Sequence, residues 1–295
     1  MGPAGVMKIL SPAKINLFLR VVGKRPDGYH DLLSLMCCIG LYDIISMNFE
    51  QEDITVHCNA ADVPSDETNL AYRAAVIFYD ELKNNPPKKH SRSGLKGVGI
   101  VIKKEIPVAA GLGGGSSNAA MVLGHLNQYY GHPFSTAELN DLGRAVGADV
   151  PFFLFRKPAI ATGIGEKLKK YNGLKPLPVL LVCPNFHVST RAVYKNLNLG
   201  LTKCEKKLKK FLFDGSVFDA KRHLCNDLET VTVPAYPELY EIKQKLLNLN
   251  ALGALMTGSG PAMFGVYADN KSVRHAFDEL QKDNRWRLYI AEILM

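Results

Sequence analysis

A run of four glycines within five positions is the feature of this sequence with the clearest capacity for chemistry. It lies in Pro107-Val108-Ala109-Ala110-Gly111-Leu112-Gly113-Gly114-Gly115-Ser116-Ser117. Because glycine has no side chain, consecutive backbone N–H groups can turn towards one point. A helix that begins directly afterwards adds unpaired N–H groups and the positive end of its dipole. The segment predicts an anion cradle, most naturally for phosphate, and the two serine hydroxyls can bind oxygen or Mg²⁺.

Two familiar phosphate-binding loops do not fit this segment. A Walker A loop needs a lysine before Ser or Thr, and no lysine follows Gly115. A dinucleotide fingerprint needs a glycine where Ser116 stands. A flexible turn without a ligand is the structural alternative, although clustered glycines carry an entropic cost that a plain loop need not bear.

A second candidate group is the carboxylate in Gly147-Ala148-Asp149-Val150-Pro151. Proline favours an extended conformation for the residue before it, which predicts Asp149 at a helix-to-strand junction. Aspartate is also common in turns for purely structural reasons. The functional alternative is a general base.

Three weaker features follow. Lys14 and Asn16 should point to the same side of the first strand, and taken alone they are better explained as solvent-facing side chains than as functional ones. The sequence Met256-Thr257-Gly258-Ser259-Gly260-Pro261-Ala262 is a second glycine-flanked turn. The basic tract 203–210 is typical of a solvated helix face.

These residues need strands and helices to position them. Hydrophobic periodicity predicts strands at 15–22, 33–39, 43–48, 54–58 and 98–103, and helices at 69–83, after the glycine run, and from the capping box at 135–138 up to 147. The Pro-rich stretch 84–96 predicts a loop. Beyond 151 the pattern predicts strands at 159–161, 179–183, 262–267 and 287–293, and helices at 190–197, 206–213, 237–247 and 272–281. The order indicates two α+β units, with a boundary between 155 and 175.

Composition narrows the class of protein. Of 295 residues, 47% are hydrophobic and 22% charged, so disorder does not describe the chain. The net charge of +8 favours anionic partners without choosing among them. The purely apolar stretches are too short for a membrane helix. Six cysteines without a C-x-x-C pair, and an N-terminus without a secretory signal, predict reduced thiols in a cytoplasmic protein.

Taken in order, these segments resemble the GHMP small-molecule kinase superfamily. The resemblance is carried by the glycine run, by 147–151, by the late glycine turn, and by Ser11-Pro12-Ala13-Lys14-Ile15-Asn16-Leu17 and Gly23-Lys24-Arg25-Pro26-Asp27-Gly28-Tyr29-His30. It is closest to the branch that acts in the non-mevalonate isoprenoid pathway. The similarity runs from about Met7 to the end and is least specific over 200–250.

The resemblance implies an α+β fold with a two-domain GHMP-kinase architecture. Residues 1–165 would form an N-terminal ATP-binding domain like domain 2 of ribosomal protein S5, and 166–295 a ferredoxin-like C-terminal domain. The implied reaction uses ATP and Mg²⁺ to phosphorylate the 2-hydroxyl of a cytidine-diphosphate-linked methylerythritol, giving the 2-phosphate and ADP. The Mg²⁺ ligands are not implied.

The resemblance also implies a role for individual residues. Asp149 would be the general base and Lys14 its partner. The residues that would wrap the ATP phosphates are Pro107, Val108, Ala109, Ala110, Gly111, Leu112, Gly113, Gly114, Gly115, Ser116 and Ser117. Asn69 and Lys104 would border the adenine. Those holding the cytidine end would be Asn16, His30, Thr190 and Tyr194, with Tyr29 stacked on cytosine.

Two alternatives remain beside this hypothesis. Another superfamily member would phosphorylate mevalonate, homoserine or a sugar, but Tyr29-His30 after the turn favours the cytidine substrate. A basic RNA-binding protein could share the N-terminal fold, but the lysines are not interleaved with aromatics and no RNP-type motif is present. We therefore expect a small-molecule substrate, no nucleic-acid or membrane partner, and a monomer or weak homodimer.

Overall fold

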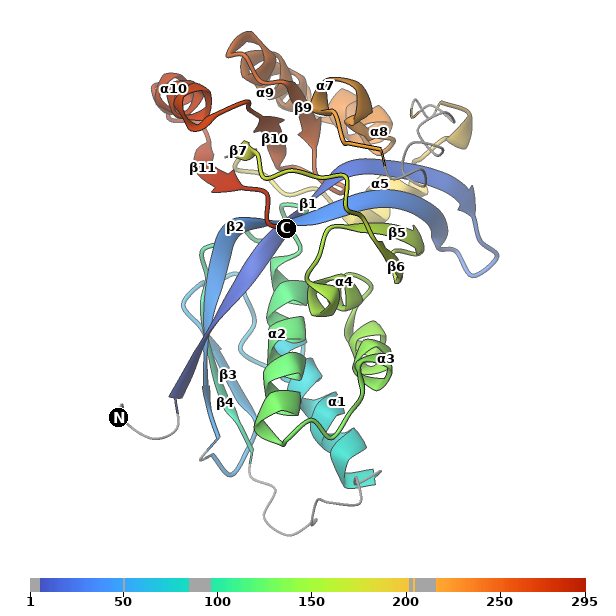
Figure 1. The fold of residues 1–295 in the computed structure, drawn as a ribbon, viewed down its shortest axis with the longest axis vertical. Coiled ribbons are helices and arrows are strands. Elements are labelled where there is room, and N and C mark those ends of the chain that lie inside the picture. The colour runs from blue at the N-terminus through green and yellow to red at the C-terminus, as the bar shows by residue number, and fades with distance from the viewer. Residues whose placement is uncertain (1–5, 50, 85–96, 202–203, 205–215) are drawn as a thin grey trace. The chain divides into compact units, whose positions relative to one another are not determined.

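The computed structural model describes residues 6–49, 51–84, 97–201, 204 and 216–295 (Figure 1). The chain forms two compact units that alternate along the sequence. Unit 1 comprises residues 1–13, 42–108 and 113–156, and unit 2 comprises 14–41, 109–112 and 157–295. The expected helix 206–213, most of the basic tract 203–210 and most of the loop 84–96 lie outside the described residues.

Unit 1 contains a small mixed sheet. It takes up the start of β1 (Val6–Lys24) and the end of β2 (His30–Asn48), together with β3 (Thr55–Cys58) and β4 (Gly99–Lys103). Strand β4 runs antiparallel to the end of β2 and parallel to β3. Ile100 and Ile102 are buried whereas Val101 is exposed. Successive side chains of a strand point to opposite faces, so this alternation gives the sheet one buried face.

Four helices complete the described part of unit 1. These are α1 (Leu70–Asn84), α2 (Gly114–Tyr129), α3 (Thr136–Val146) and α4 (Val150–Phe155). Helices α1 and α2 lie side by side (Figure 1). Ala71 and Ala74 on α1, and Ala119 and Ala120 on α2, are fully buried. Small side chains allow such helices to approach closely, and this packing fixes the start of α2, where the glycines lie.

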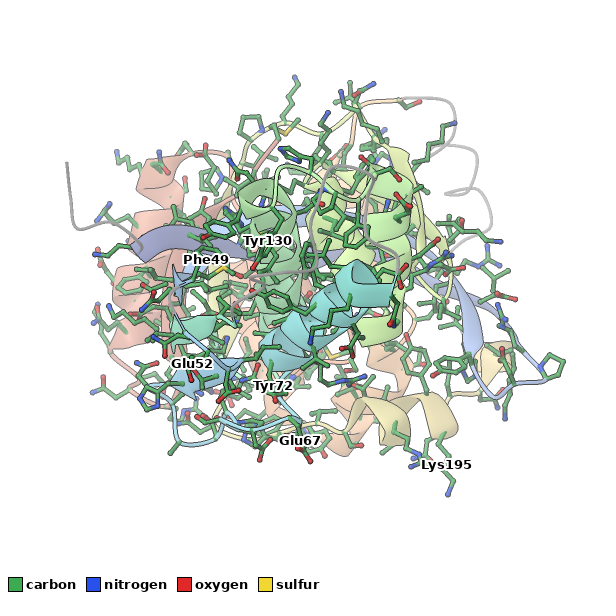
Figure 2. All side chains as sticks on the ribbon, turned by 90° about the horizontal axis from the view of Figure 1, so that it is seen from below. Phe49, Glu52, Glu67, Tyr72, Tyr130 and Lys195 are labelled. Atoms are coloured by element: carbon green, nitrogen blue, oxygen red, sulfur yellow. A yellow bond between two sulfur atoms is a disulfide. The ribbon has the colours of Figure 1, made fainter. Side chains whose placement is uncertain are left out.

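A chain of aromatic rings seals the far end of α2. Tyr129 stacks on Phe49 with ring centroids 3.7 Å apart, and the ring of Tyr130 lies 5.1 Å from that of Tyr129. Phe49 and Tyr130, at the two ends of this row, are labelled in Figure 2. Tyr130 in turn contacts Phe78 and Tyr79 on α1. Burial raises the pKa of both Tyr79 and Tyr130, so neither phenol ionises near neutral pH. These rings join the sheet, α1 and α2 into one core.

Unit 2 contains a four-stranded antiparallel sheet of ferredoxin-like type. The chain order is β7 (Pro178–Cys183), α9 (Glu238–Asn248), β9 (Gly253–Met256), β10 (Met263–Val266), α10 (Asn270–Gln281) and β11 (Arg287–Glu292). The strand order in the sheet is β11-β7-β10-β9. A β-α-β-β-α-β sequence with this order confirms the expected ferredoxin-like unit.

The remaining elements of unit 2 surround the parts of β1 and β2 that belong to it. Strand β5 (Ala159–Gly163) pairs with β2, β6 (Lys167–Lys170) pairs with β5, and β8 (Cys225–Asn226) runs parallel to β1. The short helices are α5 (Thr190–Lys195), η1 (Leu199–Leu201), α7 (Ala220–His223) and α8 (Glu229–Ala235). In the described residues no helix is long and apolar enough to span a bilayer.

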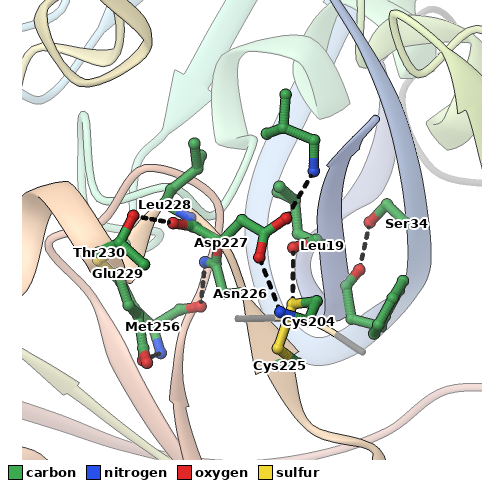
Figure 3. The surroundings of a disulfide bond; sticks show 12 residues. Leu19, Ser34, Cys204, Cys225, Asn226, Asp227, Leu228, Glu229, Thr230 and Met256 are labelled. Atoms are coloured by element: carbon green, nitrogen blue, oxygen red, sulfur yellow. Dashed lines mark hydrogen bonds between the residues drawn. A yellow bond between two sulfur atoms is a disulfide. The ribbon is translucent and has the colours of Figure 1, made fainter. Parts of the chain in front are cut away.

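The prediction that all six cysteines are reduced thiols is wrong for two of them. Cys204 and Cys225 form a disulfide, with Cα atoms 5.7 Å apart. Asp227, two residues after Cys225, accepts a hydrogen bond from the backbone N–H of Cys204 (Figure 3). Its other carboxylate oxygen accepts a hydrogen bond from the backbone N–H of Val21. The prediction was wrong for this pair because long-range pairing leaves no local spacing signal. The other four cysteines form no disulfide and are buried, and burial raises the pKa of the Cys183 thiol to about 12.

Candidate active site

The N-terminus of α2 in unit 1 has the properties of an anion-binding site. Gly114 is its first residue, and the preceding Gly113 has φ 70° and supplies no side-chain cap. No acidic residue stands in the first turn. The positive end of the helix dipole is therefore not compensated by a side chain of the helix itself. A Cβ on Gly114 would lie 2.7 Å from Nζ of Lys104, so only glycine allows the ammonium to come this close.

The two serines that follow the glycines have different surroundings. Ser117 is fully buried, and its Oγ lies 2.8 Å from Oγ of Ser11, which also contacts Asn118. Ser116 is only half-buried, and its Oγ lies 3.8 Å from the position of a Cβ on Gly147. Of the two hydroxyls, only that of Ser116 is open to a ligand. Pro107 is buried and Val108 half-buried at the start of the same segment.

The close approach of Ser116 and Gly147 brings the start of α2 near the segment that carries Asp149. Asp149 is half-buried and is the N-cap residue of α4. The expected helix-to-strand junction was wrong, because residues 150–155 form a helix. Pro151 is compatible with it, since proline is tolerated in the first turn, where its missing N–H needs no partner. The Asp149 side chain makes no cap hydrogen bond to its own helix.

Asn69 has a clear structural function at the start of α1. Its Oδ1 accepts a hydrogen bond from the Ala71 backbone at 2.9 Å, and its Nδ2 donates to the Pro64 carbonyl at 2.7 Å. Its neighbour Leu70 lies 3.4 Å from the position of a Cβ on Gly115. The structure thus brings Asn69, Lys104 and the glycines 113–115 into one region of unit 1.

In unit 2, Lys14 and Asn16 are both buried, each 4% exposed. The explanation by solvent exposure is therefore wrong. The shared side of the strand is confirmed, because Nζ of Lys14 donates to Oδ1 of Asn16 at 2.6 Å. The Asn16 amide donates to Ser34, and its backbone N–H donates to Thr257. Burying an ammonium is unfavourable unless polar groups surround it, so this arrangement is a specific one.

Residues 109–112 of the glycine segment belong to unit 2 and pack on the late glycine turn. Gly111 has φ +80°, and a Cβ there would lie 2.2 Å from the Thr257 carbonyl oxygen. Leu112 accepts a hydrogen bond from the Lys14 backbone, and Ala110 from the Ala262 backbone. Ala109 has φ 53°, in the left-handed region. Two turns 146 residues apart along the chain are therefore joined.

Asn226 holds the late turn from its other side. Its Nδ2 donates to the carbonyls of Met256 at 2.8 Å and Gly258 at 2.7 Å. Sequence analysis missed this residue because nothing in a lone asparagine of a poorly patterned segment marks it. It also missed Asp43, although a carboxylate inside an apolar strand pattern was a usable signal.

The residues expected at the cytidine end gather in two places of unit 2. His30 is buried and its ring lies 5.3 Å from that of Tyr194, whereas the adjacent Tyr29 is 61% exposed. Burial, assisted by the charge of Lys24, lowers the pKa of His30, so the ring is neutral at pH 7.

Thr190, at the first position of α5, is exposed and shares a 2.7 Å hydrogen bond with Ser259 in the late turn. The contact joins one residue expected at the cytidine end to the turn that also touches Asn16 through Thr257.

A Mg²⁺ ion needs oxygen ligands in near-octahedral geometry. Within the described residues, the cluster of His, Cys, Asp or Glu groups with metal-ligand spacing consists of Cys204, Cys225 and Asp227. Its two sulfur atoms are bonded to each other, and it does not suit Mg²⁺. The half-buried hydroxyl of Ser116 does suit it.

Comparison with known families agrees with this architecture. The model described as GHMP kinases N terminal domain matches residues 69–157, and the one described as GHMP kinases C terminal matches 207–285. A solved homoserine kinase from Cytophaga hutchinsonii shares the fold, with a TM-score of 0.72 at 14% identity over 100% of this chain and 96% of its own. The class is therefore that of the GHMP kinases, with the expected two-domain α+β architecture.

More similar proteins narrow the family. The 4-diphosphocytidyl-2-C-methyl-D-erythritol kinase of Syntrophotalea carbinolica is 47% identical over 96% of this chain and 97% of its own length. A crystal structure of 4-(cytidine 5'-diphospho)-2C-methyl-D-erythritol kinase has a TM-score of 0.79 and 34% identity over 97% of this chain and 99% of that one. The chain belongs to the 4-diphosphocytidyl-2-C-methyl-D-erythritol kinase family of the GHMP kinases. The expectation of a small-molecule kinase is confirmed.

Proposed function

We propose that the protein transfers the γ-phosphoryl group of ATP to the 2-hydroxyl of 4-diphosphocytidyl-2-C-methyl-D-erythritol. The observation that carries the nucleotide part is the uncapped, glycine-rich start of α2 beside the Lys104 ammonium. The substrate is that named for relatives covering almost the whole chain. Residues 1–165 are proposed as the ATP-binding domain and 166–295 as the C-terminal domain.

Phosphoryl transfer depends more on positioning and charge neutralisation than on covalent chemistry. Placing donor and acceptor correctly lowers the barrier by about 7–11 kcal/mol. Backbone N–H groups of residues 113–117, at the positive end of α2, would bind the phosphate oxygens. The hydroxyl of Ser116 would contribute one oxygen ligand to Mg²⁺, which when bound neutralises charge on the phosphates.

Asp149 is proposed as the general base that accepts the proton of the acceptor hydroxyl. General-base catalysis adds roughly 10²–10⁴-fold, which is less than positioning contributes. Its carboxylate is half-buried and makes no cap hydrogen bond to α4. Lys14 is proposed to stabilise negative charge, oriented by Asn16.

For the cytidine end we propose His30, Tyr29 and Tyr194. A neutral imidazole next to an aromatic ring offers both a stacking face and a hydrogen-bonding edge to a base. The exposed ring of Tyr29 is available to stack on cytosine. Asn16 and Thr190 are proposed to hold the cytidine end as well, and their hydrogen bonds to the late turn support their positions.

A cytoplasmic location is part of the proposal, because the proposed metabolic function and the four buried thiols outside the disulfide are compatible with it. The partner is proposed to be the small cytidine-diphosphate substrate, with no nucleic acid, and the chain a monomer or weak homodimer.

The decisive experiment is an ADP-release assay across candidate acceptors. The expected result is rapid turnover with 4-diphosphocytidyl-2-C-methyl-D-erythritol and none with mevalonate, homoserine or a sugar. Preferential turnover of one of the latter would replace the proposed substrate. RNA binding that ATP does not displace, measured by filter binding, would favour the RNA-binding alternative.

A further inference from the structure

Asp43 is a fully buried carboxylate that none of the functions above employs. It lies on β2 and is 0% exposed. One carboxylate oxygen accepts a hydrogen bond from Nζ of Lys104 at 2.5 Å. The other accepts the backbone N–H groups of Glu105 and Ile106, both at 2.9 Å. A single side chain thus fixes three consecutive residues that lead from β4 into the glycine segment.

The Lys104 ammonium also lies beside the start of α2. Nζ lies 2.7 Å from the position of a Cβ on Gly114, the first residue of the helix, and the lysine side chain is only 7% exposed. Placing a cation beside the positive end of a helix dipole is unfavourable by itself. The buried carboxylate of Asp43 makes this placement possible, because it supplies the opposite charge.

Stabilisation of the fold alone does not explain why the protein has a buried ion pair between Asp43 and Lys104. Replacing such a pair by well-packed apolar side chains is often neutral or stabilising for the folded state. What an apolar pair cannot do is hold an ammonium group at the N-terminus of a helix. An ammonium has three N–H donors, and the hydrogen bond to Asp43 uses one. The others can be shared with an anion, in strong charge-assisted hydrogen bonds.

We propose that Asp43 is a positioning residue for nucleotide binding: it holds the Lys104 ammonium at the start of α2, where the ammonium binds an oxygen of the nucleotide's phosphate chain. The proposal rests on the proposed kinase function and deepens it. It also changes the expected function of Lys104, from bordering the adenine to binding the phosphate chain.

The test uses Asp43→Asn, Lys104→Gln and the double variant. Asparagine keeps an oxygen for the Glu105 and Ile106 N–H groups but loses the charge that holds Lys104. Asp43→Asn should raise the KM for ATP about 10- to 100-fold, the size expected from one charge-assisted hydrogen bond. The KM for the alcohol acceptor should stay unchanged.

In the Lys104→Gln background, Asp43→Asn should have no further effect on the KM for ATP, because Asp43 acts through Lys104. The matched control is Glu105→Gln, which removes the exposed 2.9 Å ion pair of Glu105 with Lys103 on the same segment and should change neither KM. Should Asp43→Asn not fold, the double variant removes both charges and is compared with Lys104→Gln alone.

Competition by ADP and by adenosine separates phosphate binding from base binding. Affinity for ADP should fall in Asp43→Asn, while affinity for adenosine should not. Equal losses for both, an unchanged KM for ATP, or additive effects in the double variant would overturn the proposal. If the unmodified protein phosphorylates no alcohol, the proposed function fails, and equilibrium binding of ADP still tests Asp43 separately.

Discussion

Reduction of the disulfide between Cys204 and Cys225 should destabilise unit 2 by an amount that the chain entropy sets. The two cysteines are 21 residues apart in sequence. Opening a loop of this size gives the unfolded chain about 3 kcal/mol of additional conformational freedom. For a unit of this size, that corresponds to a decrease of roughly 6–12 °C in Tm. The folded state loses little, because the Asp227 carboxylate still binds the backbones of Cys204 and Val21.

The single tryptophan gives a direct readout of this effect. Trp286 belongs to unit 2, is 8% exposed and donates a hydrogen bond to Glu238. Its fluorescence during urea denaturation therefore reports unfolding of the unit that contains the disulfide. The free energy of unfolding should be about 3 kcal/mol lower with reductant than without it. The matched control, Cys204→Ser with Cys225→Ser, should give one curve in both conditions.

Thiol titration in denaturant without reductant should count four thiols, those of Cys37, Cys38, Cys58 and Cys183. Six reactive thiols, or an equal response of the double variant to reductant, would refute the reasoning.

The remaining predictions concern the site. Asp149→Asn should keep ATP affinity by calorimetry and lose roughly 10²–10⁴-fold in kcat, and unchanged turnover would remove Asp149 from the mechanism. Lys14→Ala should lower kcat more than it raises the KM for ATP; a pure affinity loss in steady-state kinetics would leave it only a binding function. Gly111→Ala should lower both Tm and activity, because the new Cβ would lie 2.2 Å from the Thr257 carbonyl oxygen and residue 111 has φ +80°. The control is Gly115→Ala, whose Cβ would lie 3.4 Å from Leu70 and should leave Tm within about 1 °C. The pKa of His30, measured by NMR titration, should lie below the usual 6.5, because burial disfavours the charged ring. Between the lowered pKa and 6.5 the unfolded chain binds more protons than the folded one, so stability should decrease as the pH falls through this interval. A pKa above 6.5 would contradict the assigned burial.

Strongly patterned elements could be predicted from local sequence alone. The expected helices 69–83 and 272–281 correspond to α1 (Leu70–Asn84) and α10 (Asn270–Gln281). The capping box at Ser135 and Glu138 is present with both hydrogen bonds. These signals are local, because a cap or an amphipathic stripe depends only on residues within a few turns.

Prediction was wrong where tertiary contacts overrode local preferences. Two strands were expected in 33–48, but β2 runs unbroken from His30 to Asn48, because it pairs with β5 at one end and β4 at the other. Helix α4 was read as extended on account of Pro151, which the first turn of a helix accepts. Strand β8 has two residues and no periodicity, and it exists only through its pairing with β1.

The sequence by itself determined the glycine segment, the polar pair Lys14 and Asn16, and the family, because these depend on residue type and spacing. Only the tertiary structure decided which groups surround them. The contact of Gly111 with Thr257, the hydrogen bonds of Asn226 to the late turn, and the Asp43 carboxylate beside Lys104 join residues 30 to 146 positions apart. No local pattern encodes such contacts, because they arise when buried polar groups must find partners as distant segments pack together.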